Sequence, residues 1–412
     1  MTPQTLARLD ALVDARFEDS VAFLAAMVRL PTDTPPGDNA PAAQRTAVLL
    51  EALGYSVERH AVPAALVHEH GMVSVTNLVV RRRFDAGPIV ALNAHGDVVP
   101  PGEGWTHPPY AAEMENGRMY GRGVAVSKSD FATYAFALDA LSRLHESGEA
   151  LRGAVELHFT YDEEMGGELG PGWLLSQGIV DPDFVIGAGF SYAVVTAHNG
   201  CLHLEVTVRG TAAHAAMPQT GVDALHATVG ILQSLYGLRE ALGRRHSAVP
   251  GIGVPTINIG LIAGGTNTNV VPALVRFSLD RRMIPEEDPA KVEAEIRDAI
   301  AAGNSAHPSA KVEIRTLLLA RALRPSPAVE PLAELLRSQA QRVFGEAPAI
   351  VGVPLYTDAR LYAEAGIPIA LYGAGPRTIL ESNAKRADEN LLLEDLRRAT
   401  KVVAATVGEL LA

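Results

Sequence analysis

Two small groups of ionisable residues each follow directly after a short apolar run. His95 and Asp97 follow the first run, and Glu163 and Glu164 follow the second. Imidazole and carboxylate groups can hold a metal ion, and a buried glutamate can take a proton as a general base. In an open α/β sheet, ligands bind outside the carboxyl ends of the strands. The spacing therefore predicts that both groups meet at one edge of a sheet and form a functional site.

The elements that would position these groups alternate between strands and helices. The apolar runs at 89–92 and 155–159 predict buried strands, and residues 130–145 have the spacing of an amphipathic helix. Residues 3–29 also carry apolar positions at helical spacing. This order predicts an α/β fold with a mostly parallel sheet and helices on both faces.

The pattern changes after Gly200. There the order becomes strand, helix, strand, strand, helix, strand, which is typical of a ferredoxin-like α+β sandwich. The first pattern resumes after Arg324. We therefore expect a discontinuous α/β domain over residues 1–198 and 317–412, with an inserted domain over residues 199–316.

The composition excludes several classes of protein. A formal net charge of −12 argues against a nucleic-acid or anionic-membrane surface. No apolar stretch is long enough to span a bilayer, and the first helix lacks the features of a signal peptide. Cys201 is the only cysteine, so no internal disulfide can form, which fits a reducing compartment. We expect a cytoplasmic protein with a small-molecule substrate.

Several motifs together resemble one family of metallopeptidases. They are NAHGDVVP, YGRG followed by SK, DEEMGG, GTAAHAAMP, TNTNVVP and GIPIALYGAGP. In this order they are similar to aminoacylase, acetylornithine deacetylase, succinyl-diaminopimelate desuccinylase and glutamate carboxypeptidase. The resemblance implies a zinc-peptidase-like α/β domain, an inserted dimerisation or lid domain, and a homodimer. It also implies an amidohydrolase with two zinc-like ions.

The resemblance further implies roles for residues of the α/β domain. It makes His95 and Glu164 metal ligands, Asp97 the residue that orients His95, and Glu163 the general base.

Other roles concern the inserted domain and the end of a late strand. The resemblance makes His214 a catalytic residue that reaches the active site of a partner subunit, and it makes Asn269 and Arg282 substrate contacts. Gly373 and Gly375 indicate either a backbone that approaches the substrate closely or a tight turn alone.

Three positions depart from the ligand pattern of the family. The resemblance places acidic ligands at Val126 and Gly189 and a histidine ligand at Lys385. These substitutions compensate most of the positive charge that would be lost with two ions. We therefore expect no metal or at most one zinc-like divalent ion, with Asp130 as a further candidate ligand, and no two-metal centre. Lys385 would then act in catalysis beside Glu163.

The preferred hypothesis is an amidohydrolase of the deacylase, dipeptidase or carboxypeptidase type that acts on a small carboxylate-bearing metabolite. One alternative is a metal-independent enzyme of proton transfer or elimination that uses Glu163 and Lys385. Another is a ligand-binding pseudoenzyme. Simpler interpretations also remain, in which His95 and Asp97 only hold a strand end together, His214 is a surface residue, and Lys385 points into water.

Overall fold

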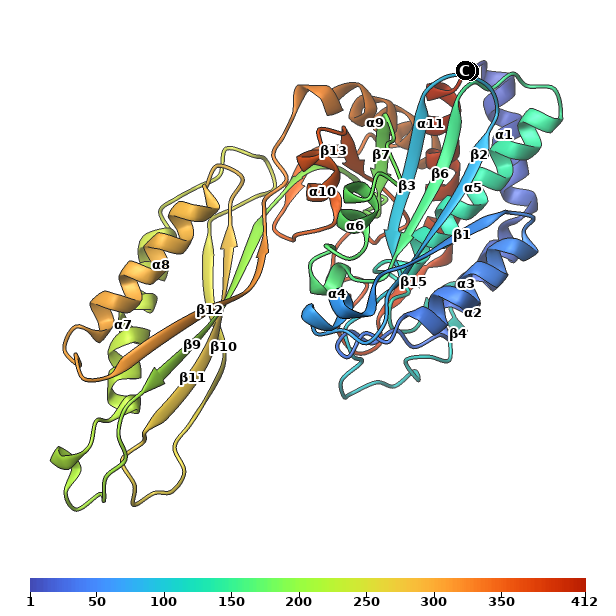
Figure 1. Cartoon of the computed structure of the whole chain (residues 1–412). Coiled ribbons are helices and arrows are strands. Elements are labelled where there is room, and N and C mark those ends of the chain that lie inside the picture. The colour runs from blue at the N-terminus through green and yellow to red at the C-terminus, as the bar shows by residue number, and fades with distance from the viewer. The chain divides into compact units, whose positions relative to one another are not determined.

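The chain folds into two compact units. The computed structural model describes all residues, 1–412 (Figure 1). Unit 1 comprises Met1–Thr196, Pro325–Ile350 and Thr357–Ala412, and unit 2 comprises Ala197–Arg324 and Val351–Tyr356. The role of unit 2 as a dimerisation or lid domain stays a prediction.

An eight-stranded sheet has the order β1-β2-β6-β3-β7-β14-β8-β13. Its strands are β1 (Val57–Ala61), β2 (Thr76–Arg83), β3 (Ile89–His95), β6 (Ala154–Thr160), β7 (Phe184–Gly187), β8 (Ala193–His198), β13 (Ala349–Val353) and β14 (Ile369–Leu371). The four central strands β6, β3, β7 and β14 pair in parallel, whereas β1 with β2, β2 with β6, and β8 with β14 pair antiparallel. The predicted α/β class with a mostly parallel sheet is confirmed.

Helices cover both faces of this sheet. In β2, Leu78 and Val80 face the main hydrophobic core, whereas Val79 faces a smaller cluster on the other side with Leu174 of α6. This alternation follows from the two-residue period of a strand. The helices of the main core are α1 (Pro3–Ala15), α2 (Phe17–Val28), α3 (Ala40–Ala52), α5 (Lys128–Glu146), α9 (Glu330–Phe344) and α11 (Leu393–Leu410). The others are α4 (Ala64–Glu69), α6 (Pro171–Ser176) and α10 (Ala359–Glu364).

Two predicted helices differ from the observed ones. The helical pattern of residues 3–29 is split into α1 and α2 at Arg16, whose φ of −113° and ψ of 10° are not helical. Helix α5 is buried on nearly all sides as far as Leu141, so it is a core helix and not an amphipathic surface helix. A three-stranded sheet of β15 (Asn390–Leu392), β5 (Arg118–Tyr120) and β4 (Glu113–Glu115) was not predicted.

Unit 2 contains a four-stranded antiparallel sheet in the order β10-β11-β9-β12. Its elements are β9 (Gly200–Arg209), α7 (Ala224–Leu242), β10 (Thr256–Gly264), β11 (Leu274–Met283), α8 (Pro289–Asn304) and β12 (Lys311–Ala320). Helices α7 and α8 lie together on one face of the sheet (Figure 1). The predicted ferredoxin-like order is therefore observed.

None of the helices is both long enough and apolar enough to cross a membrane.

Candidate active site

The two predicted groups of ionisable residues meet at one edge of the large sheet. Strands β3 and β6 are parallel and in register, so that His95 lies opposite Thr160. Asp97 then joins the two strand ends, since Oδ1 accepts a hydrogen bond from the Glu163 amide (3.2 Å) and Oδ2 accepts one from the Glu164 amide (3.0 Å). Both glutamates belong to a short 3₁₀ turn, η1 (Glu163–Met165).

The imidazole of His95 lies between Asp97 and Glu163. Its Nδ1 is 3.0 Å from the carbonyl oxygen of Asp97 and 3.3 Å from the Asp97 carboxylate. Its Nε2 is 3.8 Å from Oε2 of Glu163. Burial opposes a charge on His95, but Glu163 and Asp97 outweigh it and raise the pKa of His95 to about 10. Glu163 and Asp97 together hold this side chain in one orientation.

Lys385 reaches the same edge from a turn near the C-terminus. Its Nζ donates to Oε2 of Glu164 over 2.7 Å, although 47% of the Lys385 side chain is exposed. Burial lowers the pKa of Lys385, but Glu164 and Glu163 outweigh this effect and leave the pKa raised. The ammonium group is therefore paired with an acidic group and does not point only into water.

Two further carboxyl groups belong to this edge, and one of them, Asp358, was not predicted from the sequence. Asp162 and Asp358 are buried, and burial raises the pKa of both. Repulsion from Asp97 adds to the rise at Asp162, whose pKa reaches about 8, and repulsion from Asp162 adds to the rise at Asp358. Neither Asp162 Oδ1 nor Asp358 Oδ2 has a hydrogen-bond partner. Asp162 directly precedes Glu163 and belongs to the same run of acidic residues in the sequence. Asp358 precedes α10 and carries no signal in the sequence except that of a helix start.

Asp130 has a structural role, because it accepts hydrogen bonds from two neighbouring loops. Its Oδ1 accepts from the Ala374 amide (2.7 Å) and its Oδ2 from the Gly189 amide (3.2 Å). A Cβ atom at Gly373 would lie 2.1 Å from Oδ1 of Asp130. Asp130 therefore binds the loops that follow β7 and β14, and Gly373 is required by this close approach of Asp130 to the backbone.

The other two glycines are also confined by neighbouring backbone. A Cβ atom at Gly189 would lie 2.7 Å from the Tyr372 amide nitrogen, and one at Gly375 would lie 2.3 Å from the Gly189 oxygen. The Gly375 amide donates to that oxygen over 2.9 Å. Close packing of two loops explains both glycines, and position 189 has no room for the side chain of an acidic ligand.

The predicted residues of unit 2 lie at opposite ends of its sheet. His214 forms an isolated bridge with Val270, next to Asn269, on loops at the Leu274 end of β11. Arg282 lies near the other end of β11, where Asp280 binds its Nε and Nη2, both at 3.0 Å. Leu274 and Arg282 are eight residue steps apart along the strand, which corresponds to roughly 26 Å. One copy of unit 2 therefore cannot bring His214 and Arg282 to the same small molecule.

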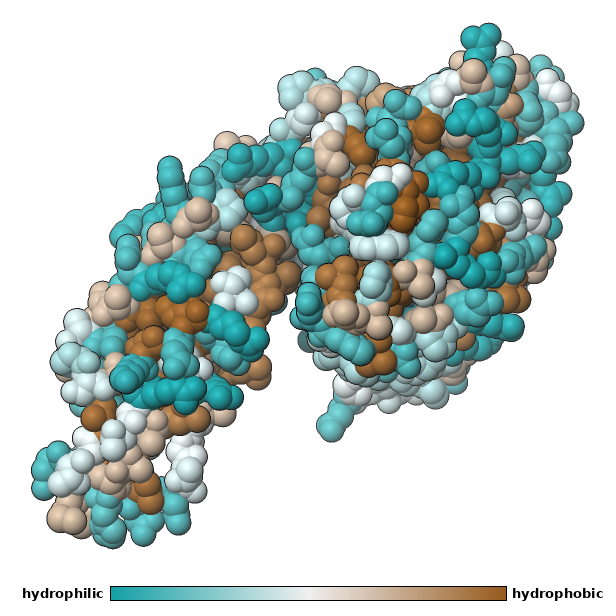
Figure 2. Space-filling model, in the orientation of Figure 1, coloured by the Kyte–Doolittle hydropathy of each residue, from teal (hydrophilic) through white to brown (hydrophobic).

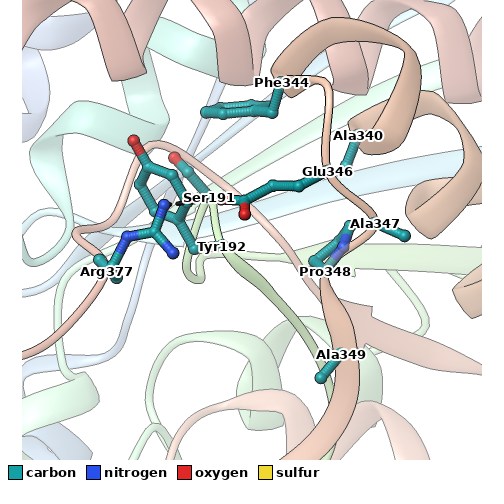
Figure 3. Close-up of a pocket in the computed structure, with 9 residues that line it drawn as sticks. All are labelled: Ser191, Tyr192, Ala340, Phe344, Glu346, Ala347, Pro348, Ala349 and Arg377. Carbon is teal, nitrogen blue, oxygen red and sulfur yellow. Dashed lines mark hydrogen bonds and ion pairs between the residues drawn. The ribbon is translucent and has the colours of Figure 1, made fainter.

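A pocket of about 210 Å³ lies elsewhere in unit 1. Figure 3 shows Tyr192, Phe344, Glu346 and Arg377 among the residues that line it. Arg377 forms an ion pair with Glu346 (2.7 Å) and lies 3.9 Å from the centre of the Tyr192 ring. None of the residues predicted for the site lines this pocket.

The groups around His95 fit a divalent cation. Imidazole nitrogen and carboxylate oxygen are the ligands of zinc in many hydrolases. The raised pKa values of Asp162, Glu163 and Asp358 reflect buried carboxyl groups that repel one another. A cation near His95 would reduce this repulsion, so the residues present fit a metal of the kind that the resemblance implies.

Comparison with protein families identifies one match over most of the chain. The family described as peptidase family M20/M25/M40 matches residues 91–409. A relative of known sequence is the succinyl-diaminopimelate desuccinylase of Methylobacterium sp. (strain 4-46). It is 29% identical over 397 residues, which cover 93% of this chain and 93% of the relative.

Solved structures of this family have the same fold. An M20 family metallo-carboxypeptidase from Sulfolobus solfataricus superposes with a TM-score of 0.77 at 18% identity, over 94% of this chain and 98% of that one. A dinuclear metal-binding peptidase of the M20 family from Bacillus subtilis superposes with a TM-score of 0.66 at 15% identity, over 97% and 99% of the two chains.

These matches correct the cofactor prediction. The sequence led us to expect no metal or at most one zinc-like ion, and no two-metal centre. That expectation is wrong for this family, since one of its members with this fold is a dinuclear metal-binding peptidase. The residues at Val126, Gly189 and Lys385 are not sufficient grounds to exclude two ions, because ligands are brought together by the tertiary structure and not by motif positions alone.

Proposed function

The chain belongs to peptidase family M20/M25/M40, and on this basis we propose that it hydrolyses the amide bond of a small metabolite that carries a free carboxylate. N-acyl amino acids and dipeptides are the substrate classes that fit this proposal. The desuccinylase relative supports an N-acyl substrate, because its name describes removal of a succinyl group from succinyl-diaminopimelate.

The observation that carries this proposal is the environment of Glu163. Burial raises the pKa of Glu163 to about 7, while His95 and Lys385 oppose the rise. A general base works best when its pKa lies near the working pH. We assign Glu163 to take a proton from the attacking water and to pass it to the leaving nitrogen.

The residues next to Glu163 would hold the metal. We assign His95 and Glu164 as ligands, with Asp97 orienting His95 through Nδ1 and fixing both glutamates through their amides. Metal ions, when bound, lower the pKa of water and polarise the carbonyl group of a substrate. Lys385 balances the charge of Glu164 and lowers the pKa of the nearby Glu163.

The substrate contacts would come from unit 2. We assign Arg282 to the substrate carboxylate, because Asp280 holds its guanidinium plane from one side and fixes its direction. His214 and Asn269 lie on exposed loops, where His214 Nδ1 accepts from the Ala216 amide (3.0 Å). That bond fixes the ring and leaves Nε2 to donate to the oxyanion.

We further propose that two copies pair through unit 2. Leu225, Val229 and Tyr236 lie along one side of α7 and are exposed, as are Leu261 and Ile262 of the edge strand β10. Figure 2 shows hydrophobic residues among polar ones on the visible surface of this unit. Exposed apolar groups and an open strand edge favour association. A partner copy would also supply the His214 that one copy cannot bring to Arg282.

The experiment is an assay for amine release. Purified protein is incubated with N-succinyl and N-acetyl amino acids and with dipeptides, with zinc or cobalt added, and free amine is measured over time. We expect hydrolysis that stops after treatment with a chelator and returns with metal. Substrates whose carboxylate is blocked as a methyl ester should react much more slowly.

Variants separate catalysis from binding. Glu163→Gln should lower kcat by about 10²–10⁴-fold, the usual contribution of a general base, without a matching rise in KM. The control Glu69→Gln changes an exposed glutamate of unit 1 and should have no effect. Absence of hydrolysis on the whole substrate panel, or full activity of Glu163→Gln, would contradict the proposal.

A further inference from the structure

A second group of potential metal ligands lies in unit 2, on the sheet. Cys201 and His203 are two residues apart on β9 and therefore point to the same face, and Asp280 of β11 lies directly opposite His203 in the register. The alternate residues Leu202 and Leu204 face the core that α7 and α8 form. Cys201, His203 and Asp280 thus lie on the sheet face that these two helices do not cover.

The three side chains converge on a small volume. Nε2 of His203 is 3.1 Å from Sγ of Cys201 and 3.3 Å from Oδ2 of Asp280. Sγ of Cys201 is 3.6 Å from Oδ1 of Asp280. One ligand atom from each residue lies within 4.8 Å of the other two, and no other group of three or more histidines, cysteines, aspartates or glutamates does so.

These separations are close to those of ligands around one zinc ion: the Nε2–Oδ2 distance of 3.3 Å matches, whereas the Nε2–Sγ distance of 3.1 Å is shorter and would lengthen on binding. Bonds of about 2.0–2.3 Å at tetrahedral angles place neighbouring nitrogen, oxygen and sulfur ligands roughly 3.3–3.6 Å apart. We propose that Cys201, His203 and Asp280 bind one divalent ion of the zinc type in unit 2, through one sulfur, one nitrogen and one oxygen. Three protein ligands leave a fourth position for water or another small ligand.

The contacts within the cluster direct three potential ligand atoms toward one point. Nε2 of His203 faces both the thiol and the carboxylate, and the Cys201 thiol donates to Oδ1 of Asp280. A metal ion at this point would replace these hydrogen bonds by three metal–ligand bonds. Arg282 binds the Asp280 carboxylate through Nε and Nη2, which fixes the orientation of a ligand in the manner common around metal sites.

A cysteine nucleophile activated by histidine explains the cluster less well. In such triads the carboxylate binds the imidazole nitrogen opposite to the one that faces the nucleophile. Here Asp280 and Cys201 share Nε2 of His203. Burial also raises the pKa of the Cys201 thiol to about 12, so the group by itself is not a reactive thiolate.

A metal ion can reach the cluster from solvent. Cys201 is buried, but 36% of the His203 side chain and 29% of the Asp280 side chain are exposed. The sulfur therefore forms the inner end of the site, and the other two ligands form its rim.

The test uses cobalt as the probe, on the full-length protein. A thiolate bound to Co²⁺ gives a charge-transfer absorption in the near ultraviolet. Cys201 is the only cysteine of the chain, so this absorption reports the proposed site alone, whatever metal is bound near His95. We expect the absorption to saturate at one Co²⁺ per chain and to disappear when Zn²⁺ is added in competition.

Two variants test the other ligands. His203→Gln and Asp280→Asn should each weaken Co²⁺ binding by about 10-fold or more, the least that loss of a contributing group costs at metal sites. The matched control His226→Gln, on α7, should leave the titration unchanged. Far-ultraviolet circular dichroism checks that each variant is folded. Because His203 is partly exposed, we expect His203→Gln to disturb the fold less than Asp280→Asn. No charge-transfer absorption at excess Co²⁺, or the same affinity in both ligand variants as in the parent, overturns the proposal.

Discussion

The ammonium nitrogen of Lys385 lies 2.7 Å from a carboxylate oxygen of Glu164, although 221 residues separate the two in the chain. Four residues after Lys385, the carboxylate of Glu389 binds Arg122 over 2.6 Å. The segment that carries Lys385 is thereby anchored to the loop before α5. The charge of the lysine is held beside the glutamates by the fold and not by a flexible side chain alone.

Replacing Lys385 should move the pH profile of activity. The positive charge of Lys385 lowers the pKa of Glu163, so Lys385→Met should raise that pKa further above its ordinary value. Glu163 must be deprotonated to act as a base. The acidic limb of kcat/KM should therefore shift to higher pH, with less change on the alkaline side.

Lys385→Arg is the control for this prediction, because it keeps the charge. Its acidic limb should stay close to that of the parent protein. Equal profiles for the parent and for Lys385→Met would contradict the electrostatic role of Lys385.

Mixing two inactive variants should restore activity if the partner copy supplies His214. Glu163→Gln and His214→Ala should each be inactive alone. Random exchange of subunits makes half of the dimers mixed. Each mixed dimer has two sites, and one of them contains both Glu163 and His214. The mixture should thus reach about a quarter of the parent activity.

The control is a mixture of Glu163→Gln with the double variant Glu163→Gln/His214→Ala, which cannot form a complete site. Light scattering after gel filtration checks that the protein is dimeric. A dimer whose mixture stays inactive would show that His214 does not act across subunits.

The ion pair of Arg122 and Glu389 should be costly to break. Both side chains are buried, and Glu389 Oε1 also accepts from the Ala125 (3.0 Å) and Val126 (3.3 Å) amides. Arg122→Met would leave a buried carboxylate without its partner. We expect a loss of about 3–5 kcal/mol in the free energy of unfolding.

Urea unfolding can measure this loss in unit 1 alone, because both tryptophans, Trp105 and Trp173, belong to that unit. The double variant Arg122→Met/Glu389→Gln should recover much of the stability. Arg337→Met, which breaks an exposed pair with Glu334, should cost less than about 1 kcal/mol. Equal costs for the buried and the exposed pair would contradict the prediction.

Lys128 should make unit 1 more stable as the pH rises above 7. Burial lowers the pKa of Lys128 to about 7, against an ordinary value of 10.5, and its Nζ donates to the Leu30 carbonyl. Between these two pKa values the unfolded chain binds a proton that the folded chain does not. The free energy of unfolding therefore increases with pH in this window, by at most about 1.4 kcal/mol per pH unit.

Tryptophan-monitored urea unfolding of the parent and Lys128→Met at pH 7, 8 and 9 measures this effect. Other titrating groups contribute equally to both proteins, so the difference in slope isolates Lys128. Parallel pH dependences would mean that Lys128 is charged in the folded protein at all these pH values.

The order of elements and the main site could be predicted because both depend on short stretches of sequence. Strand β3 begins with a continuous apolar run, β6 alternates apolar residues with Glu156 and His158, and the groups proposed for catalysis lie at or just after the ends of these strands. Parallel pairing of two such strands places His95, Glu163 and Glu164 at one edge without any further information. The period of two in β9 likewise places Cys201 and His203 on one face.

Contacts between distant segments could not be predicted in this way. Asp358 joins the carboxyl groups near Glu163 only because of where α10 begins, and nothing in its own neighbours indicates this. The small size of Gly189 looked like the loss of a ligand, whereas the structure shows a close approach of the backbone at Tyr372. Periodicity describes the faces of an element and carries no information on what packs against them.

The sequence by itself determined most of the elements and their order, the family, and the residue types at the ends of β3 and β6, because these follow from local periodicity and from motifs of adjacent residues. The tertiary structure decided which charges neutralise one another: Lys385 with Glu164, Arg122 with Glu389, and Asp280 with Arg282. Electrostatic pairing depends on distance in space and on exclusion of water, and both quantities exist only once the chain has folded.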